Sequence, residues 1–177
     1  MTDPLPLVKD LAVISLAADH RLQENEAFRD FIRNYPGDVD GMVQEINKSV
    51  EPFIDCTNCG NCCRSLMINV SEEEILPLAQ HLQRNPEEVK AAYLEESQGG
   101  QFVINTIPCH FLEDNKCSVY EYRFEGCRAF PHLDEPGFSK RMFGLLMHYG
   151  RCPIIFNVME ELKHRTKFVI EINQLPL

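Results

Sequence analysis

Four cysteines within eight positions constrain this chain more than any other feature of its sequence. They form the C-x2-C-x2-C-C run Cys56-Thr57-Asn58-Cys59-Gly60-Asn61-Cys62-Cys63. In a C-x2-C step, the turn between the cysteines lets both sulfurs approach one metal ion. Two overlapping steps, the second of which contains a glycine, predict a loop whose thiolates face a common metal or iron–sulfur centre.

All of the other cysteines lie downstream of this run, so none is found in the first 55 residues. We take all eight as candidate metal ligands: Cys56, Cys59, Cys62, Cys63, Cys109, Cys117, Cys127 and Cys152. By spacing, Cys56, Cys59 and Cys62 are the first choices, because the same C-x2-C-x2-C opens a bacterial ferredoxin cluster site. The fourth ligand of that pattern often precedes a proline, and Cys152-Pro153 has this form. Cys63 would serve a second metal or replace one of the three.

Size and charge narrow the classes of protein to consider. A chain of 177 residues with 44% hydrophobic residues can bury a core as one domain, without needing disulfides. The formal charge of −10 argues against nucleic acid as a partner, because phosphate binding needs clustered lysine and arginine. We see no secretory signal, and the mainly apolar stretch 11–18 is too short to span a membrane. We therefore expect a cytoplasmic protein, where cysteine clusters more often bind metal than form disulfides.

Periodicity and turn signals predict a mostly α fold with a small irregular β-hairpin and loop region, organised as a single domain around the cysteine-ligated metal site. Within it, residues 1–50 would be an N-terminal helical extension and residues 51–177 the metal-binding domain. The apolar stripe of that extension would be core or a surface for a protein partner. The expected helices are 7–33 with a break near His20, 39–50, 71–83, 85–96, 120–130, 138–149 and 154–165. Strands are expected at 101–106 and 167–172, and a hairpin at 109–119 that turns at Asp114-Asn115.

A second set of motifs follows the cysteine run. It reads Pro108-Cys109-His110-Phe111-Leu112, then Lys116-Cys117-Ser118-Val119-Tyr120, then Cys127-Arg128-Ala129-Phe130-Pro131. Together with residues 56–63, this closely resembles the CxxCxxCC cysteine-cluster family, also called YkgJ-type proteins, over about residues 54–155. One departure is Phe124, which stands where the family usually has proline after the arginine.

The resemblance implies a zinc- or iron-chelating domain. The family is also similar, more distantly, to flagellin lysine methylase. That enzyme has the same cysteine pattern and an iron–sulfur cluster, and it depends on S-adenosylmethionine. For most stand-alone members no reaction is assigned. The resemblance therefore implies a site more directly than an activity.

Two metals fit the cysteines. Structural zinc takes a tetrahedron of thiolates, so eight cysteines could make two zinc sites. Adjacent residues such as Cys62 and Cys63 rarely ligate one ion well, whereas a cluster with several irons tolerates dense and irregular ligation. We therefore expect a [4Fe-4S] iron–sulfur cluster as the cofactor, with zinc as the alternative. Because the ligands are spread along the chain, we also expect metal binding and folding to be linked.

Other polar residues lie beside the cysteines. His110 and His148 could supply nitrogen ligands, although each is more typical of an ordinary surface or hydrogen-bonded imidazole. Arg123 and Arg128 flank Cys127; they would either offset thiolate charge or form ion pairs with nearby glutamates. The sequence does not decide between these roles.

The predicted function is that of a metal-binding protein with a redox, sensing or metal-handling role. One alternative is an S-adenosylmethionine-dependent protein lysine methylase or related modifying enzyme, although 177 residues leave little room for a separate cofactor domain. The other is a zinc-stabilised protein-interaction module. No nucleotide-binding, metalloprotease, hydrolase or three-cysteine radical signature occurs, so the sequence names no reaction and no catalytic residue. The oligomeric state is also open.

Overall fold

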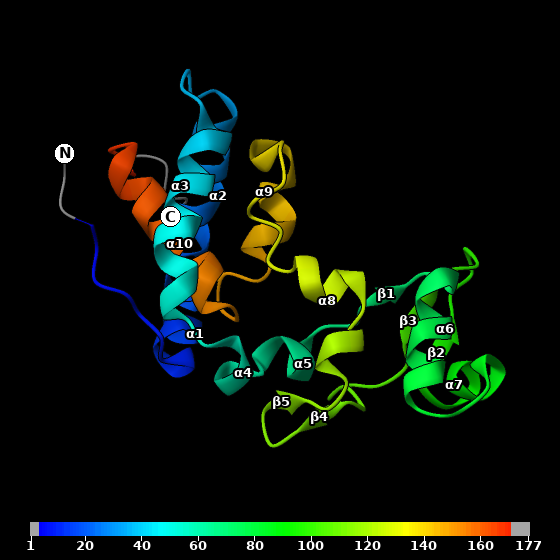
Figure 1. Cartoon of the computed structure of the whole chain (residues 1–177). Coiled ribbons are helices and arrows are strands. Elements are labelled where there is room, and N and C mark those ends of the chain that lie inside the picture. The colour runs from blue at the N-terminus through cyan, green and yellow to red at the C-terminus, as the bar shows by residue number, and fades with distance from the viewer. Residues whose placement is uncertain (1–3, 171–177) are drawn as a thin grey trace. The chain divides into compact units, whose positions relative to one another are not determined.

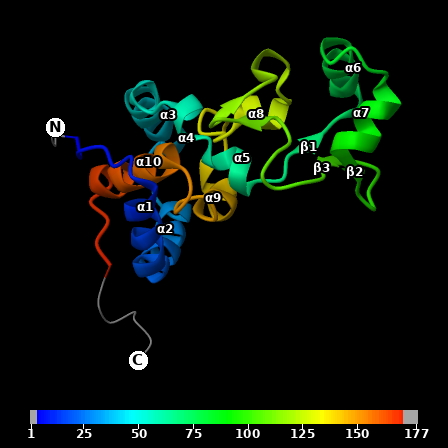
Figure 2. The same ribbon diagram turned by 90° about the horizontal axis from the view of Figure 1, so that it is seen from below.

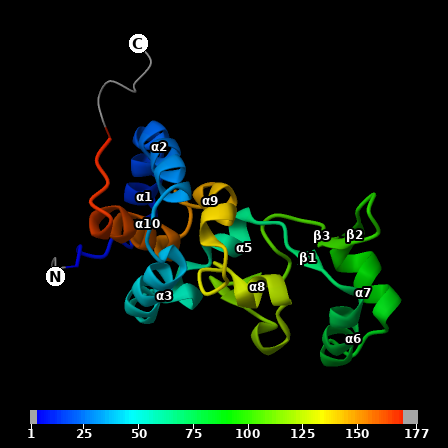
Figure 3. The ribbon, with the colours of Figure 1, turned by 90° about the horizontal axis from the view of Figure 1, so that it is seen from above.

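The structure is a computed structural model, and it describes residues 4–170. Contacts divide the chain into two compact units. Among the described residues, the first unit consists of 4–54 and 131–170, and the second unit is Asp55–Phe130. Figures 1, 2 and 3 show the course of the chain in three orientations. The predicted boundary between an extension at 1–50 and a domain at 51–177 stays a prediction.

All of the regular secondary structure among the described residues of the first unit is helical. Its elements are α1 Leu11–His20, α2 Leu22–Arg33, α3 Val39–Val50, the 3-10 turn η1 Glu51–Phe53, α9 Phe138–Leu146 and α10 Pro153–Arg165. Asp10 and Asp38 cap α1 and α3, because their carboxylates accept hydrogen bonds from amides of the first turn. The predicted break near His20 is confirmed at Arg21, between α1 and α2.

Helix α10 lies at the centre of the first unit. Most of its residues from Pro153 to Lys163 are buried, and it packs against α3 and α1. Its neighbours contribute apolar side chains that are almost fully buried, among them Ile14, Phe28, Ile46 and Met142. This core is separate from the cysteine-rich part of the chain, since seven of the eight cysteines fall within residues 55–130.

The second unit mixes short helices with short strands. Its elements are α4 Cys56–Cys59, α5 Asn61–Ser65, β1 Asn69–Val70, α6 Glu72–His81, α7 Pro86–Tyr93, β2 Leu94–Glu96, β3 Phe102–Ile104, β4 Leu112–Glu113, β5 Lys116–Cys117, the 3-10 turn η2 Tyr120–Tyr122 and α8 Glu125–Ala129. The strands form an antiparallel sheet in the order β1-β3-β2 and a separate β4-β5 pair. The prediction of a mostly α fold with a small β-hairpin region is therefore confirmed.

Local sequence signals explain most of these elements. Capping boxes at Ser71 with Glu74 and at Asn85 with Glu88 begin α6 and α7, close to the predicted helix starts at 71 and 85. The hairpin turns at Asp114 and Asn115, whose φ angles of 46° and 69° suit the tight turn that joins two antiparallel strands.

Three predicted elements were wrong. The single helix expected over 120–130 is instead the 3-10 turn η2 and the helix α8, separated by extended backbone at Arg123 and Phe124. The helix expected over 85–96 ends at Tyr93, and residues 94–96 instead form β2, which pairs with β3 and buries Leu94. The strand expected over 167–172 does not form at 167–170, where Lys167 has a φ of 53°, and its last two residues lie outside the described range.

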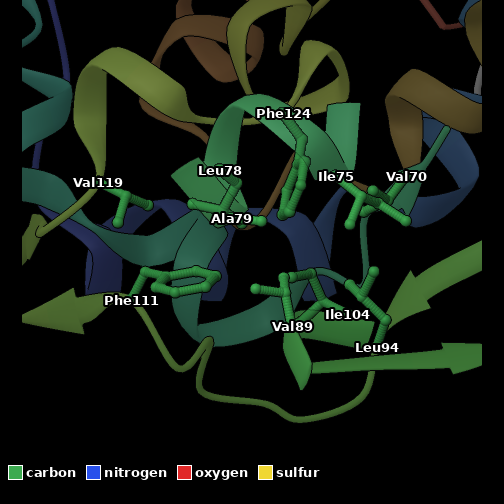
Figure 4. Close-up of a cluster of buried hydrophobic side chains, with 10 residues drawn as sticks. All are labelled: Val70, Ile75, Leu78, Ala79, Val89, Leu94, Ile104, Phe111, Val119 and Phe124. Carbon is green, nitrogen blue, oxygen red and sulfur yellow. The ribbon is translucent and has the colours of Figure 1, made fainter. Parts of the chain in front are cut away.

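A compact apolar core holds the second unit together (Figure 4). It consists of Val70, Ile75, Leu78, Ala79, Val89, Leu94, Ile104, Phe111, Val119 and Phe124. Cys109, Cys117 and Cys127 pack against this core. The segments that carry these three cysteines are thus fixed by hydrophobic packing as well as by hairpin and helix formation. Among the described residues, no helix combines the length and the apolar character needed to cross a membrane.

We expect Leu78→Ala to lower the free energy of unfolding by about 2–5 kcal/mol, because Leu78 is fully buried and the smaller side chain leaves a cavity. On the same helix, Leu76→Ala is the matched control: Leu76 is 52% exposed, so the change should stay within about 0.5 kcal/mol. Urea unfolding followed by circular dichroism measures both. Equal losses in the two variants would contradict the assignment of this core.

Candidate metal centre

The first C-x2-C step forms a single turn of helix, α4. The Asp55 side chain caps it by accepting hydrogen bonds from the amides of Thr57 and Asn58 at 2.9 and 3.3 Å. Cys56 and Cys59 stand three residues apart, which places them on one face of the turn. Cys56 is exposed and Cys59 is half-buried.

Glycine at position 60 redirects the chain between α4 and α5. Gly60 has a φ of 56°, in the left-handed region that other residues rarely adopt. A Cβ atom at this position would lie 2.9 Å from the backbone oxygen of Asn115. The glycine therefore allows the cysteine loop to approach the β4-β5 turn. Arg64 strengthens this contact, because it donates to the Cys59 carbonyl at 3.0 Å and to the Asn115 side chain.

The downstream cysteines reach the loop from three separate segments. The Cys109 amide donates to the Cys63 carbonyl at 2.8 Å, which ties residue 109 directly to the loop. Cys117 lies in β5 opposite Leu112, and Cys127 lies in the middle of α8. Each of the three is half-buried.

Four thiols form one electrostatic group. They are Cys62, Cys109, Cys117 and Cys127, and in every pair among them the charge of one thiolate raises the pKa of the other. Burial of these sulfurs weakens the screening by water, so the charge of one thiolate acts on the pKa of another. The structure thus brings together residues that are up to 65 positions apart (127 − 62).

Burial is the main reason why three of these thiols resist ionisation. It raises the pKa of Cys127 to about 12, with the thiolate charges of Cys109, Cys117 and Cys62 adding to the effect. Burial likewise raises the pKa of Cys109 and of Cys117, and the neighbouring thiolates add to it. Without a cation, a half-buried group of thiols favours the protonated forms.

The adjacent pair Cys62 and Cys63 shares one proton. The Cys63 thiol donates a hydrogen bond to the Cys62 sulfur, which lowers the pKa of Cys62 to about 6. The same hydrogen bond raises the pKa of Cys63, and burial and the thiolates of Cys62, Cys109 and Cys117 raise it further. Cys63 therefore borders the group of four as a hydrogen-bond donor.

The two arginines beside Cys127 have different roles. Arg123 lies close enough to lower the pKa of Cys62, and it acts in the same direction on Cys117 and Cys127. Its guanidinium carbon stands 4.0 Å from the centre of the Tyr120 ring, which holds the side chain in place. Arg128 instead pairs with Glu125 at 3.3 Å. Arg123 thus favours the ionised thiols, whereas Arg128 is engaged by Glu125.

The remaining sequence candidates lie in other surroundings. Cys152 belongs to the first unit, where it is 8% exposed and precedes the first residue of α10. The His110 ring contacts the Asn105 side-chain oxygen, with 2.6 Å between Nε2 and Oδ1. Burial lowers the pKa of His148, which is also in the first unit. Arg123 is the residue whose part in the site the sequence could not decide.

No disulfide bond joins the cysteines of residues 4–170. Within the same range, no three side chains of histidine, cysteine, aspartate or glutamate form a ready-made set around one ion. The assignment of individual cysteines as ligands accordingly stays a prediction. What the structure supplies is the electrostatic group of four thiols and the loop that borders it.

A family model matches residues 55–149, which is more than half of the chain. The chain belongs to the CxxCxxCC family. The description of that family is "putative zinc- or iron-chelating domain". The match includes every cysteine of the second unit and ends before Cys152. Membership in the CxxCxxCC family identifies this cysteine-rich region as a metal-binding domain. No curated protein and no solved structure matches the chain.

We expect Gly60→Ala to lower both the melting temperature and the metal content. Alanine would hold an unfavourable backbone conformation and meet the Asn115 oxygen, at a cost of about 1–3 kcal/mol. Differential scanning calorimetry and elemental analysis measure the two effects.

Gly144→Ala in α9 is the matched control for this substitution. Its added methyl group meets nothing within 4 Å, and alanine stabilises a helix by about 0.5–1 kcal/mol relative to glycine. The interpretation of the loop fails if Gly60→Ala keeps wild-type stability and metal content.

Proposed function

We propose that the second unit holds a [4Fe-4S] cluster through Cys62, Cys109, Cys117 and Cys127. The packing of Cys109, Cys117 and Cys127 against one apolar core, with Cys109 hydrogen-bonded to the cysteine loop at Cys63, supports this most directly. The effect of each thiolate on the pKa of the others agrees with it. Four cysteine thiolates are the usual ligand set of such a cluster. The cluster would supply one-electron chemistry, in a redox, sensing or metal-handling role.

The same four thiols would also suit a single zinc ion, which takes four thiolates in a tetrahedron. The density of sulfur favours iron. Cys63 adjoins Cys62, and Cys56 and Cys59 precede them within the same run, so seven thiols are present in a unit of 76 residues (130 − 55 + 1). An iron–sulfur cluster spreads its ligation over several metal atoms and accommodates such crowding better than one ion does.

The chain's own residues prepare this site for a cation. Arg123 already favours the ionised thiols, and the hydrogen bond from Cys63 lowers the pKa of Cys62. The hydrophobic core beneath Cys109, Cys117 and Cys127 limits the access of water to one side of the site. Low water access strengthens the attraction between thiolates and a metal. A reducing compartment such as the cytoplasm would keep these thiols available.

The identity of the metal is tested by anaerobic purification followed by elemental analysis and a visible spectrum. We expect about four iron atoms per chain and broad absorbance at about 400 nm. A colourless protein with near-stoichiometric zinc and no iron would contradict this proposal and support a zinc-stabilised protein-interaction module instead.

We expect Cys127→Ala to reduce the bound iron by more than about half, because the variant removes one of four ligands. Cys152→Ala is the matched control: we propose that Cys152 is a core residue of the first unit, so this variant should keep its iron. Equal iron loss in both variants would contradict the ligand set. Equal iron retention would do so as well.

Removal of the metal should destabilise the second unit in particular. The four thiols come from segments between residues 62 and 127, and metal binding closes the chain between them. We expect chelated protein to show a lower melting temperature and reduced helical signal in far-ultraviolet circular dichroism. The linkage between metal and folding is refuted by an unchanged melting curve after complete metal removal.

A further inference from the structure

The proposed ligand set leaves out the first C-x2-C step, Cys56 and Cys59. Both thiols are reduced in the structure, and they lie in α4, which contacts β5 (Figure 1). Two cysteines can form a disulfide bond only where the backbone already holds them within a narrow range of distance. The chemistry open to this pair therefore depends on the geometry of the α4 turn.

The backbone of α4 places the two cysteines within that range. In an α-helical turn, the Cα atoms of residues three apart lie about 5 Å from each other. Disulfide-bonded cysteines have Cα atoms about 4.4–6.8 Å apart. The second C-x2-C step, from Cys59 to Cys62, lacks this geometry, because Gly60 with its left-handed φ separates α4 from α5. The first step is thus the one suited to an internal disulfide.

Hydrogen bonds to Asp55 fix the turn at its start. The carboxylate accepts from the amide and the hydroxyl of Thr57 at 2.9 and 2.6 Å. It also accepts from the amide and the side-chain nitrogen of Asn58 at 3.3 and 2.6 Å. At the other end, Arg64 donates to the Cys59 carbonyl at 3.0 Å. A turn that is held at both ends keeps its two reactive groups in position for each other.

The two thiols differ in their access to solvent. Cys56 is exposed and Cys59 is half-buried. An exposed thiol can meet a disulfide from solution, and a neighbouring thiol can then resolve the mixed disulfide that forms. Reactive cysteines that respond to oxidation are typically accessible and stand next to such a resolving cysteine.

We propose that Cys56 and Cys59 form a reversible dithiol–disulfide site that exchanges with small-molecule disulfides. The Cys56 thiolate attacks one sulfur of the disulfide, forms a mixed disulfide and releases the first small thiolate. The Cys59 thiolate then attacks the Cys56 sulfur and releases the second. Two protein thiols are oxidised to one disulfide, one small-molecule disulfide is reduced to two thiols, and the protons pass to the released thiolates. Because the product is exposed and lies in a short turn, it is the kind of disulfide that is readily reduced again.

The proposal rests on the proposed ligand set in one respect, since it requires Cys56 and Cys59 to lie outside that set. Oxidation of the pair should therefore leave the bound metal in place. A pair that also held metal would release it on oxidation, because a disulfide sulfur no longer offers a thiolate.

Equilibration of the metal-loaded full chain with anaerobic mixtures of glutathione and glutathione disulfide tests this proposal. Alkylation followed by tandem mass spectrometry locates the cysteines that have become oxidised, and elemental analysis of the same samples gives the metal content. We expect the wild type to lose two alkylated thiols, at Cys56 and Cys59, with no loss of metal. Cys56→Ser should abolish this disulfide. Cys59→Ser should stop at the mixed disulfide on Cys56, because the resolving thiol is gone.

Cys152→Ser is the matched control, since Cys152 is a buried thiol of the first unit, and this variant should oxidise as the wild type does. The proposal is overturned if Cys56 and Cys59 stay alkylated in every mixture, or if Cys59 joins Cys62 instead. Loss of metal in Cys56→Ser or Cys59→Ser also overturns it, because the pair then belongs to the ligand set. Failure of the proposed function shows differently, as a wild type that holds no metal, and in that protein the Cys56–Cys59 disulfide still decides this proposal.

Discussion

The chemistry of the second unit depends on the repulsion between thiolates in a place where water screens their charges poorly. Burial makes Cys109, Cys117 and Cys127 harder to ionise, and the thiolate charge of Cys62 adds to the effect on each of them. A cation removes this conflict, because it attracts every thiolate at once. One guanidinium, that of Arg123, already acts in that direction. The arrangement is unfavourable for four free thiolates, and we propose that a bound metal relieves this repulsion.

The fold supports this site with elements that are individually small. The β4-β5 strands have two residues each and α8 has five, so none of them would be stable alone. Packing against the apolar core of Figure 4 fixes the positions of Cys109, Cys117 and Cys127. The left-handed Gly60 then brings the cysteine loop against the hairpin turn. Hydrophobic burial thus stabilises the same short segments that we propose to bind the metal.

Features set by neighbouring residues could be predicted from the sequence. The capping boxes, the turn at Asp114-Asn115 and the C-x2-C-x2-C-C motif with its family resemblance all depend on residues close together in the chain. Features set by distant residues could not. Leu94–Glu96 follows a good helix start, and only its pairing with β3 makes it a strand. Spacing favoured Cys56, Cys59 and Cys62, whereas the electrostatic group joins Cys62 to three downstream cysteines, a result of how the second unit packs.

X-ray absorption at the metal edge of the anaerobically purified protein tests the central claim most directly, because it identifies the atoms bound to the metal. The account predicts a first shell composed only of sulfur, at about 2.3 Å. It also predicts that Cys127→Ala changes this shell while Cys152→Ala leaves it intact. A first shell dominated by nitrogen or oxygen would contradict convergence of the thiols, as would a sulfur shell that is unchanged in Cys127→Ala.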